Sequence, residues 1–428
     1  MAKKNVENIN GFVLCDNVLT KYRGGMGNVI IPDGVVEIKT LAFKTWGAKI
    51  TSLTIPDSVI KIEPFAFVDC KVATHFNLSS SLDRIEEGVF EGCNALKEID
   101  LPDKIRIIGC SAFANCVNLE RVKLPAKLSS IYSNAFDRCK SLKHITIPKN
   151  VKRIYDGAFS ACISLETVIL PNGLKEIGTF AFYGCIKLKH IIIPNSVTKI
   201  APCAFSTCIN LEKVEILCEK MESIGQEAFI DCRSLKTITM PKQINTIGER
   251  AFENCSSLEQ CVVPQGLKIL QKGIFRACKS LESVVLPDSI VKICGEAVAF
   301  CNKLSSINIP SNLESIGEYA FTQTALTEVI LPNNTTVIRD GAFYECRDLG
   351  YIQIPPSVTS LGKDALGGCD PLKLNICCVA NSVADKYARK HDFHKLISLQ
   401  AIENKCPNCA TKLVKNAFFC HHCGTKIV

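Results

Sequence analysis

Residues 119–139 read LERVKLPAKLSSIYSNAFDRC, and this stretch decides the fold because the chain repeats it with variations about every 23 residues. Val122 and Leu124 flank Lys123, which is the alternation of a half-buried strand. Pro125 has no amide hydrogen for a sheet ladder, so it ends the strand. Each repeat is therefore expected to contribute one strand to a parallel sheet.

The second half of the same stretch supplies the other core positions. Leu128 and Ile131 are three residues apart and provide the next inward contacts. Ala135, Phe136 and Cys139 follow at helical spacing, which predicts one short helical turn. The aromatic ring is expected to fill the interior of the repeat.

The Ala-Phe pair marks the repeat along most of the chain. Steps between neighbouring positions of this slot are 22 to 24 residues, and the slot is occupied by Phe43, Phe67, Phe90, Phe113, Phe136, Phe159, Phe182, Phe205, Phe229, Phe252, Phe275, Val298, Phe321, Phe343 and Leu366. Such a period indicates stacked units whose apolar faces are buried only against each other, so the predicted fold is a solenoid of about fifteen repeats over residues 29–371. A solenoid offers a long surface rather than a pocket, which favours binding over catalysis.

The repeat resembles the BspA-type leucine-rich repeat. The pattern C-x-x-L-x-x-I-x-I-P-x-x-V-x-x-I-G-x-x-A-F stands at residues 232–252 as CRSLKTITMPKQINTIGERAF. The resemblance covers about residues 29–371 and implies a curved leucine-rich repeat solenoid, mainly parallel sheet with short helical turns. It also implies a strand-lined face used for recognition, without naming a partner.

Thirteen cysteines stand three residues after the aromatic position: Cys70, Cys93, Cys116, Cys139, Cys162, Cys185, Cys208, Cys232, Cys255, Cys278, Cys301, Cys346 and Cys369. A fixed apolar setting is typical of small buried side chains, so we interpret them as a reduced core ladder. Structural disulfides between neighbouring turns and a redox sensor are the alternatives. The first residues do not resemble a secretory signal, and we expect a cytoplasmic protein.

Three repeats depart from the pattern. Trp46 replaces the first ladder cysteine and is expected to be a larger plug. Leu217 and Cys218 stand where the strand-ending proline is missing, inside a 24-residue step that predicts a small bulge. Thr324 interrupts the cysteine ladder.

Both ends of the repeat array need caps, because an open solenoid exposes its core and a sheet edge. Residues 12–15 and 18–22 flank Asp16-Asn17 and predict a hairpin within an N-terminal cap of residues 1–28. Residues 382–390 begin with a serine and predict a short capping helix within residues 372–400.

Residues 401–428 resemble a small zinc ribbon. Two Cys-x-x-Cys knuckles supply four thiolates for tetrahedral Zn²⁺, and the candidate ligands are Cys406, Cys409, Cys420 and Cys423. A closed four-cysteine site leaves no position for water, so this one ion would be structural. A thiol redox pair is the alternative.

Charge is uneven along the chain. Residues 1–371 hold 41 basic and 39 acidic side chains, whereas residues 372–428 hold nine basic and three acidic ones. Any attraction to polyanions is therefore expected in the tail.

The sequence predicts a non-enzymatic intracellular scaffold that binds a protein partner through the sheet face. No apolar run is long enough to cross a bilayer, and no catalytic motif stands out. The candidate partner-binding face consists of the outward strand positions Thr146, Ile169, Ile192, Val262 and Val285, although β-propensity alone also explains such residues. Two alternatives stay open: nucleic-acid binding through the basic zinc-ribbon tail, and a surface adhesin or effector.

Overall fold

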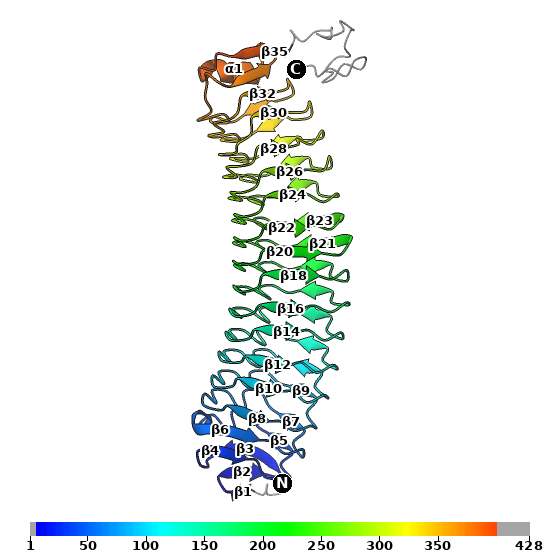
Figure 1. The fold of residues 1–428 in the computed structure, drawn as a ribbon, viewed down its shortest axis with the longest axis vertical. Helices are drawn as coiled ribbons and strands as arrows, with labels where there is room; N and C mark the ends of the chain where they lie inside the picture. The colour runs from blue at the N-terminus through cyan, green and yellow to red at the C-terminus, as the bar shows by residue number, and fades with distance from the viewer. Residues whose placement is uncertain (1–5, 400–428) are drawn as a thin grey trace, which may run out of the picture. The chain divides into compact units, whose positions relative to one another are not determined.

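A computed structural model describes residues 6–399 of the chain (Figure 1). The chain divides into two units, Met1–Glu259 and Gln260–Val428. Each unit is a stack of short parallel strands joined by turns, with one short α-helix among the described residues. The predicted mainly-β solenoid with parallel sheets is confirmed.

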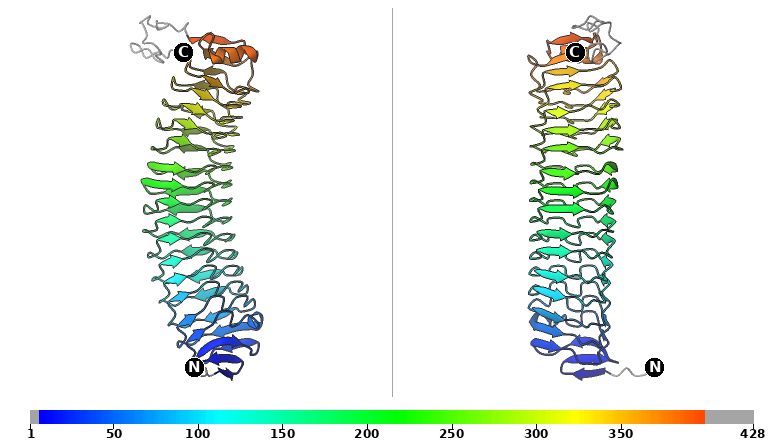
Figure 2. Two further views of the ribbon diagram at one scale, coloured as in Figure 1. Left: turned by 180° about the vertical axis from the view of Figure 1, so that it is seen from behind. Right: turned by 45° about the vertical axis from the view of Figure 1, so that its right-hand side comes forward.

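The first unit has two layers of strands, which the two views of Figure 2 show from different sides. The long-strand layer holds the predicted strands: β4 (Gly27–Ile30), β6 (Ile50–Thr54), β8 (His75–Asn77), β10 (Glu98–Asp100), β12 (Arg121–Lys123), β14 (His144–Thr146), β16 (Thr167–Ile169), β18 (His190–Ile193), β20 (Lys213–Ile216) and β22 (Thr237–Thr239). Equivalent residues of consecutive repeats pair in register, as Ile99 does with Val122.

The short-strand layer was not predicted. Its members are β5 (Glu37–Ile38), β7 (Lys61–Ile62), β9 (Arg84–Ile85), β11 (Ile107–Ile108), β13 (Ser130–Ile131), β15 (Arg153–Ile154), β17 (Glu176–Ile177), β19 (Lys199–Ile200), β21 (Lys220–Ile224) and β23 (Gln243–Ile247). Strands β9 to β23 of this layer form one eight-stranded parallel sheet. Most of these strands have two residues, too few to show an alternating pattern in the sequence.

The second unit repeats the same arrangement. Its long strands are β24 (Gln260–Val262), β26 (Ser283–Val285), β28 (Ser306–Ile307), β30 (Glu328–Ile330), β32 (Tyr351–Gln353), β34 (Asn375–Cys378) and β35 (Leu396–Ser398). Its short strands are β25 (Ile269–Leu270), β27 (Lys292–Ile293), β29 (Ser315–Ile316), β31 (Val337–Ile338) and β33 (Ser360–Leu361).

The core of each unit is a column of phenylalanines beside a column of cysteines. Phe136 and Phe159 stack with ring centroids 5.3 Å apart and planes 1° apart, and both rings are fully buried. The Cys162 thiol donates to the carbonyl oxygen of Phe136 in the preceding repeat at 3.2 Å. The same contact recurs along most of the ladder, so the cysteine both fills space and bonds a buried carbonyl.

The predicted helical turn is a different structure. The Cys139 amide donates to the Phe136 carbonyl at 3.2 Å, which closes a turn. Asn134 precedes this turn with a φ of 57°, and Arg138 lies within it with a φ of 56°. These two left-handed residues prevent a right-handed helix from forming, so the repeat contains a tight turn instead.

Two further expectations about departures from the repeat were wrong. Trp46 is only half-buried, so it is not the expected plug of the core. The buried Gly47 packs against the next ladder position instead, because a β-carbon added at Gly47 would be 2.8 Å from the Cys70 sulfur. Strand β20 pairs with β18 at a sequence offset of 23 residues and with β22 at an offset of 24, in both cases without a break in register. Strand β19 pairs with β21 at an offset of 24 residues. The extra residue therefore lies in the turn at residues 217–219, not in a bulge.

The caps agree with the predicted hairpin and helix. Strands β2 (Phe12–Cys15) and β3 (Val18–Tyr22) are antiparallel, and an unpredicted strand β1 (Val6–Ile9) pairs with β2. One 3₁₀ turn, η1 (Gly47–Lys49), precedes β6. Helix α1 (Val383–Lys390) begins after Ser382, whose hydroxyl accepts a hydrogen bond from the Asp385 amide at 3.2 Å. The Tyr387 hydroxyl accepts a bond from the Leu366 amide at 3.0 Å, which ties the helix to the repeats.

Candidate functional site

The candidate face of the first unit lies on the outward side of β14, β16 and β18. Inward residues such as Val168 and Ile191 are buried, so their neighbours in the strand point away from the core. Thr146 pairs with Ile169 in adjacent strands. Ile169 is 54% exposed and Ile192 is 46% exposed, and β16 and β18 are neighbours in the layer. The two isoleucines thus form an exposed apolar pair.

Polar groups border this pair. On one side, the Glu215 carboxylate accepts from the Lys213 ammonium at 2.6 Å and lies 3.1 Å from His190 Nε2. The hydrogen bond from Lys213 is the main reason why the pKa of Glu215 is lowered. On the other side of the pair, Thr146 and Lys123 are exposed.

The second unit carries its own apolar pair. Val262 and Val285 are opposite each other in β24 and β26, and they are 65% and 51% exposed. The next outward residue, Asn308, binds the backbone of Leu286 through both ends of its amide, each at 2.7 Å. This amide closes one side of the valine pair.

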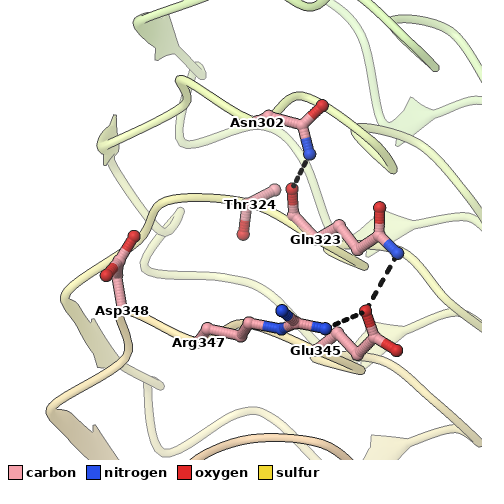
Figure 3. A pocket seen from close by; sticks show the side chains of 6 residues that line it. All are labelled: Asn302, Gln323, Thr324, Glu345, Arg347 and Asp348. Carbon is pink, nitrogen blue, oxygen red and sulfur yellow. Dashed lines mark hydrogen bonds and ion pairs between the residues drawn. The ribbon is translucent and has the colours of Figure 1, made fainter.

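A shallow pocket lies in the second unit where a repeat is one residue short (Figure 3). The Thr324 hydroxyl, at the ladder position, donates at 3.0 Å to the carbonyl of Phe321 in its own repeat. Because the following loop lacks a residue, a pocket of about 290 Å³ remains, lined by Asn302, Gln323, Thr324, Glu345, Arg347 and Asp348.

The polar groups of this pocket bind one another. The Asn302 amide donates to the Gln323 carbonyl at 3.2 Å, and the Gln323 side chain donates to the Glu345 carboxylate at 3.1 Å. Arg347 donates to the same Glu345 oxygen at 3.2 Å. The pocket is explained by the shorter repeat, and its strongest donors are already engaged.

The thiols of the cysteine ladder are poor nucleophiles. None of the 21 cysteines in the described part of the chain forms a disulfide. Burial raises the pKa of Cys116 and of Cys208 to about 12. A thiol with such a pKa stays protonated at neutral pH and is a poor nucleophile, which disfavours the redox-sensor alternative.

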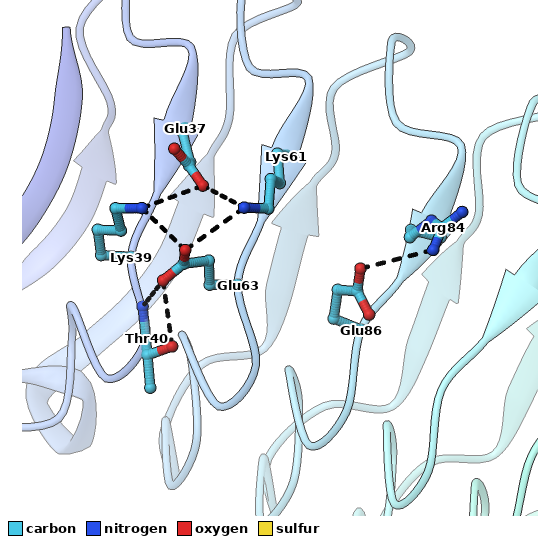
Figure 4. Close-up of polar contacts among 7 residues, drawn as sticks. All are labelled: Glu37, Lys39, Thr40, Lys61, Glu63, Arg84 and Glu86. Carbon is cyan, nitrogen blue, oxygen red and sulfur yellow. Dashed lines mark hydrogen bonds and ion pairs between the residues drawn. The ribbon is translucent and has the colours of Figure 1, made fainter.

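The first short strands carry balanced ion pairs (Figure 4). The Lys39 ammonium lies 2.8 Å from Glu63 and 3.2 Å from Glu37, and Lys61 contacts both carboxylates as well. The hydrogen bond from Lys39 is the largest contribution that lowers the pKa of Glu63 to about 2. The two lysines and the two glutamates of this network balance each other's charge.

The other predicted site falls outside the described residues. Cys406, Cys409, Cys420 and Cys423 belong to residues 400–428, so the structure describes none of the four. Within residues 6–399, no group of three or more His, Cys, Asp or Glu side chains is arranged to hold a metal ion. No helix of the same part of the chain is both long and apolar enough for a bilayer.

The similarity of this chain to known proteins lies in its repeats. The sequence pattern described as BspA type leucine rich repeat region (6 copies) matches residues 21–143, 129–259 and 245–373. None of the curated proteins matches the chain.

Two solved structures illustrate the likeness. A leucine-rich repeat protein from Bacteroides ovatus is 27% identical with a TM-score of 0.58, over 93% of this chain and 98% of that one. A leucine rich cell surface protein from Faecalibacterium prausnitzii is also 27% identical, with a TM-score of 0.46, over 90% and 97% of the two chains. Because the family pattern matches well over half of the sequence, the chain belongs to the BspA-type leucine-rich repeat family.

Proposed function

We propose that this chain is a non-enzymatic scaffold that binds a protein partner through the outward face of its long-strand layer. Leucine-rich repeat solenoids present extended surfaces of this kind, and the family assignment supports a binding role. The observation that carries the proposal is the exposed pair Ile169 and Ile192 on neighbouring strands. Aliphatic side chains gathered on an otherwise charged surface mark contact sites.

The surroundings of the pair fit a protein interface. Interfaces of this class have an apolar centre and a polar rim that keeps its hydrogen bonds. Here the rim contains Thr146 on one side and the Lys213–Glu215–His190 group on the other. In the second unit, Val262 and Val285 form a separate patch that would contact the partner independently.

The experiment that tests this function is capture of a partner with full-length bait from nuclease-treated lysate of the source cells. The Ile169→Glu/Ile192→Glu variant is expected to lose about tenfold or more of the captured protein, because two charges would be buried at the centre of the contact. A matched control, Asn77→Glu/Thr239→Glu, adds the same charge to the same layer at exposed positions away from the pair. Equal loss from both variants, or no loss from either, contradicts the proposed face.

The C-terminal segment is proposed to hold one structural Zn²⁺ through Cys406, Cys409, Cys420 and Cys423. The spacing of the two knuckles supports a four-thiolate site, and a segment this short needs the metal to fold. Metal analysis of the purified full-length protein should give about one zinc per chain. Cys406→Ser/Cys420→Ser should remove it, whereas Cys15→Ser/Cys110→Ser, at half-exposed positions in the repeats, should retain it. Zinc content that is absent, or equal in both variants, contradicts this assignment.

A cytoplasmic location is proposed with the scaffold, supported by the many buried ladder cysteines that form no disulfide within residues 6–399. Two other functions predict different results in the same capture experiment. Nucleic-acid binding through the tail would make capture depend on nuclease treatment and on Cys406 and Cys420. A surface adhesin or effector would show ladder disulfides in native material, since an oxidising environment bridges neighbouring thiols.

A further inference from the structure

A strip of positive charge follows the short-strand layer of the first unit. We define the basic strip as Lys104, Arg106, Lys127, Lys149, Lys152, Arg153, Lys175 and Lys199. In the five turn-and-strand segments that carry it, residues 102–108, 125–131, 148–154, 171–177 and 194–200, the only acidic residues are Asp103 and Glu176. The near-neutral total for residues 1–371 therefore conceals a local excess of cations, and attraction to polyanions is not confined to the tail.

The members of the strip come from consecutive turns of one sheet. Strands β11, β13, β15, β17 and β19 pair in that order. The Lys175 amide donates to the Lys152 carbonyl at 2.8 Å, and the Thr198 amide donates to the Lys175 carbonyl at 3.0 Å. Since neighbouring parallel strands are ~4.8 Å apart, the strip runs for ~19 Å along the layer.

Most cations of the strip have no carboxylate partner. Arg153 and Lys199 share Glu176 at 3.4 and 3.5 Å. No ion pair occurs within residues 6–399 for the other six members, Lys104, Arg106, Lys127, Lys149, Lys152 and Lys175. The earlier strands of the same layer differ, because their lysines form ion pairs: Lys39 pairs with Glu63 and Lys61 pairs with Glu37 (Figure 4). The charge of the strip is thus available to a ligand.

A stacked tyrosine pair borders the strip. The rings of Tyr132 and Tyr155 have centroids 4.8 Å apart and planes 27° apart, and the Arg153 guanidinium lies 4.7 Å from the centroid of Tyr155. Both tyrosines are half-buried. The turns on either side carry Gly109 and Gly178 at the same position after the inward isoleucine, so neither adds a side chain over the pair. The tyrosines form a platform with solvent-accessible surface.

The composition of this surface indicates the class of ligand. Protein interfaces have an apolar centre and are depleted in lysine, whereas nucleic-acid interfaces are polar and strongly positive. Single-stranded nucleic acid is held by cations along its phosphates together with aromatic rings on which bases stack. We propose that the basic strip and the Tyr132–Tyr155 pair bind single-stranded nucleic acid, with phosphates on the strip and a base stacked on Tyr132. This site lies in the short-strand layer and is independent of the proposed protein-binding face.

The test measures binding of a labelled oligothymidylate of about 15 nucleotides to the full-length protein by fluorescence anisotropy over a range of salt concentrations. The variant Lys127→Gln/Lys149→Gln/Lys152→Gln/Lys175→Gln is expected to bind about a hundredfold more weakly near 0.1 M salt. Its plot of log affinity against log salt should be less steep by about 3, because four phosphate contacts are lost. The matched control, Lys97→Gln/Lys140→Gln/Lys189→Gln/Lys236→Gln, removes the same charge from exposed positions outside the strip and should bind as the wild type does.

A second variant separates stacking from charge. Tyr132→Ala is expected to lose about tenfold in affinity for the oligonucleotide while its salt dependence stays unchanged. Tyr183→Ala, an exposed tyrosine on a different part of the repeat, is the control and should have no effect. Melting curves of the two lysine variants should match the wild type, because the substituted lysines are exposed and have no ion-pair partner in residues 6–399.

Several outcomes overturn the proposal. Equal weakening by the two lysine sets would show non-specific attraction to a basic protein. Binding of heparin or polyglutamate that depends on the lysines but not on Tyr132, with no effect of Tyr132→Ala on the oligonucleotide, would assign the strip to another polyanion. No measurable oligonucleotide binding removes the site, whereas the result at Ile169 and Ile192 would be unaffected.

Discussion

Replacing Phe182 with alanine is expected to lower the free energy of unfolding by about 3–5 kcal/mol. The ring is fully buried and stacks between Phe159 and Phe205, at centroid distances of 5.5 and 5.3 Å. Removing it leaves a cavity in the column that the adjacent repeats cannot close without moving the sheets that hold them. Urea denaturation measures the loss in free energy of unfolding. Hydrogen exchange of the Phe182 and Phe205 amides, each of which donates to a carbonyl of the next repeat, shows whether the loss is local.

The chain offers a matched control two residues away. Phe180 is 44% exposed, has φ of 55°, and packs edge-on against Tyr183 at 5.6 Å. Phe180→Ala should cost about 1 kcal/mol, well below the loss at Phe182, because it removes a partly exposed ring and its edge-on contact with Tyr183. Phe180→Gly should be about 1 kcal/mol more stable than Phe180→Ala, because glycine adopts the left-handed conformation without strain. A similar loss at both phenylalanines would refute the placement of Phe182 in the core.

The long-strand layer could be predicted because its pattern is redundant. Each repeat gives two inward residues around an outward one, then a proline, and the register is fixed by the recurring aromatic. The short-strand layer escaped because two-residue strands such as β13 show no alternation. The predicted helical turn was wrong because left-handed residues such as Asn134 and Arg138 look like ordinary exposed positions in the sequence.

The candidate sites were also predicted only in part from the sequence. The outward positions of Ile169 and Ile192 followed from the period of the strand, and the structure exposes both. That they bind a partner stays a prediction. The basic strip was missed because charge was summed along the chain. Alignment of the repeats by their aromatic position brings Lys152 and Lys175 into one column, and that signal was present in the sequence.

Replacing Gly225 with alanine is expected to lower the free energy of unfolding by about 2–3 kcal/mol, although only a methyl group is added. A β-carbon at this position would lie 2.4 Å from the backbone nitrogen of Pro202 and 2.6 Å from the carbonyl carbon of Ala201. Both atoms belong to the backbone of the preceding turn, so no side-chain rotation relieves the clash. The two turns must separate, which weakens the bond from the Gly225 amide to the Ile200 carbonyl, now 2.8 Å.

Gly25→Ala is the control for this substitution, because a β-carbon at Gly25 meets nothing within 4 Å. It should leave the melting curve within about 0.5 kcal/mol of the wild type. Hydrogen exchange should locate the effect of Gly225→Ala in the amides of residues 223–225, next to the clash. Equal stability of the two variants would mean that the repeats are spaced more widely than the structure has them. The glycine after the inward isoleucine would then be a turn residue, and close stacking of the short-strand layer would not be the reason for its presence in the family pattern.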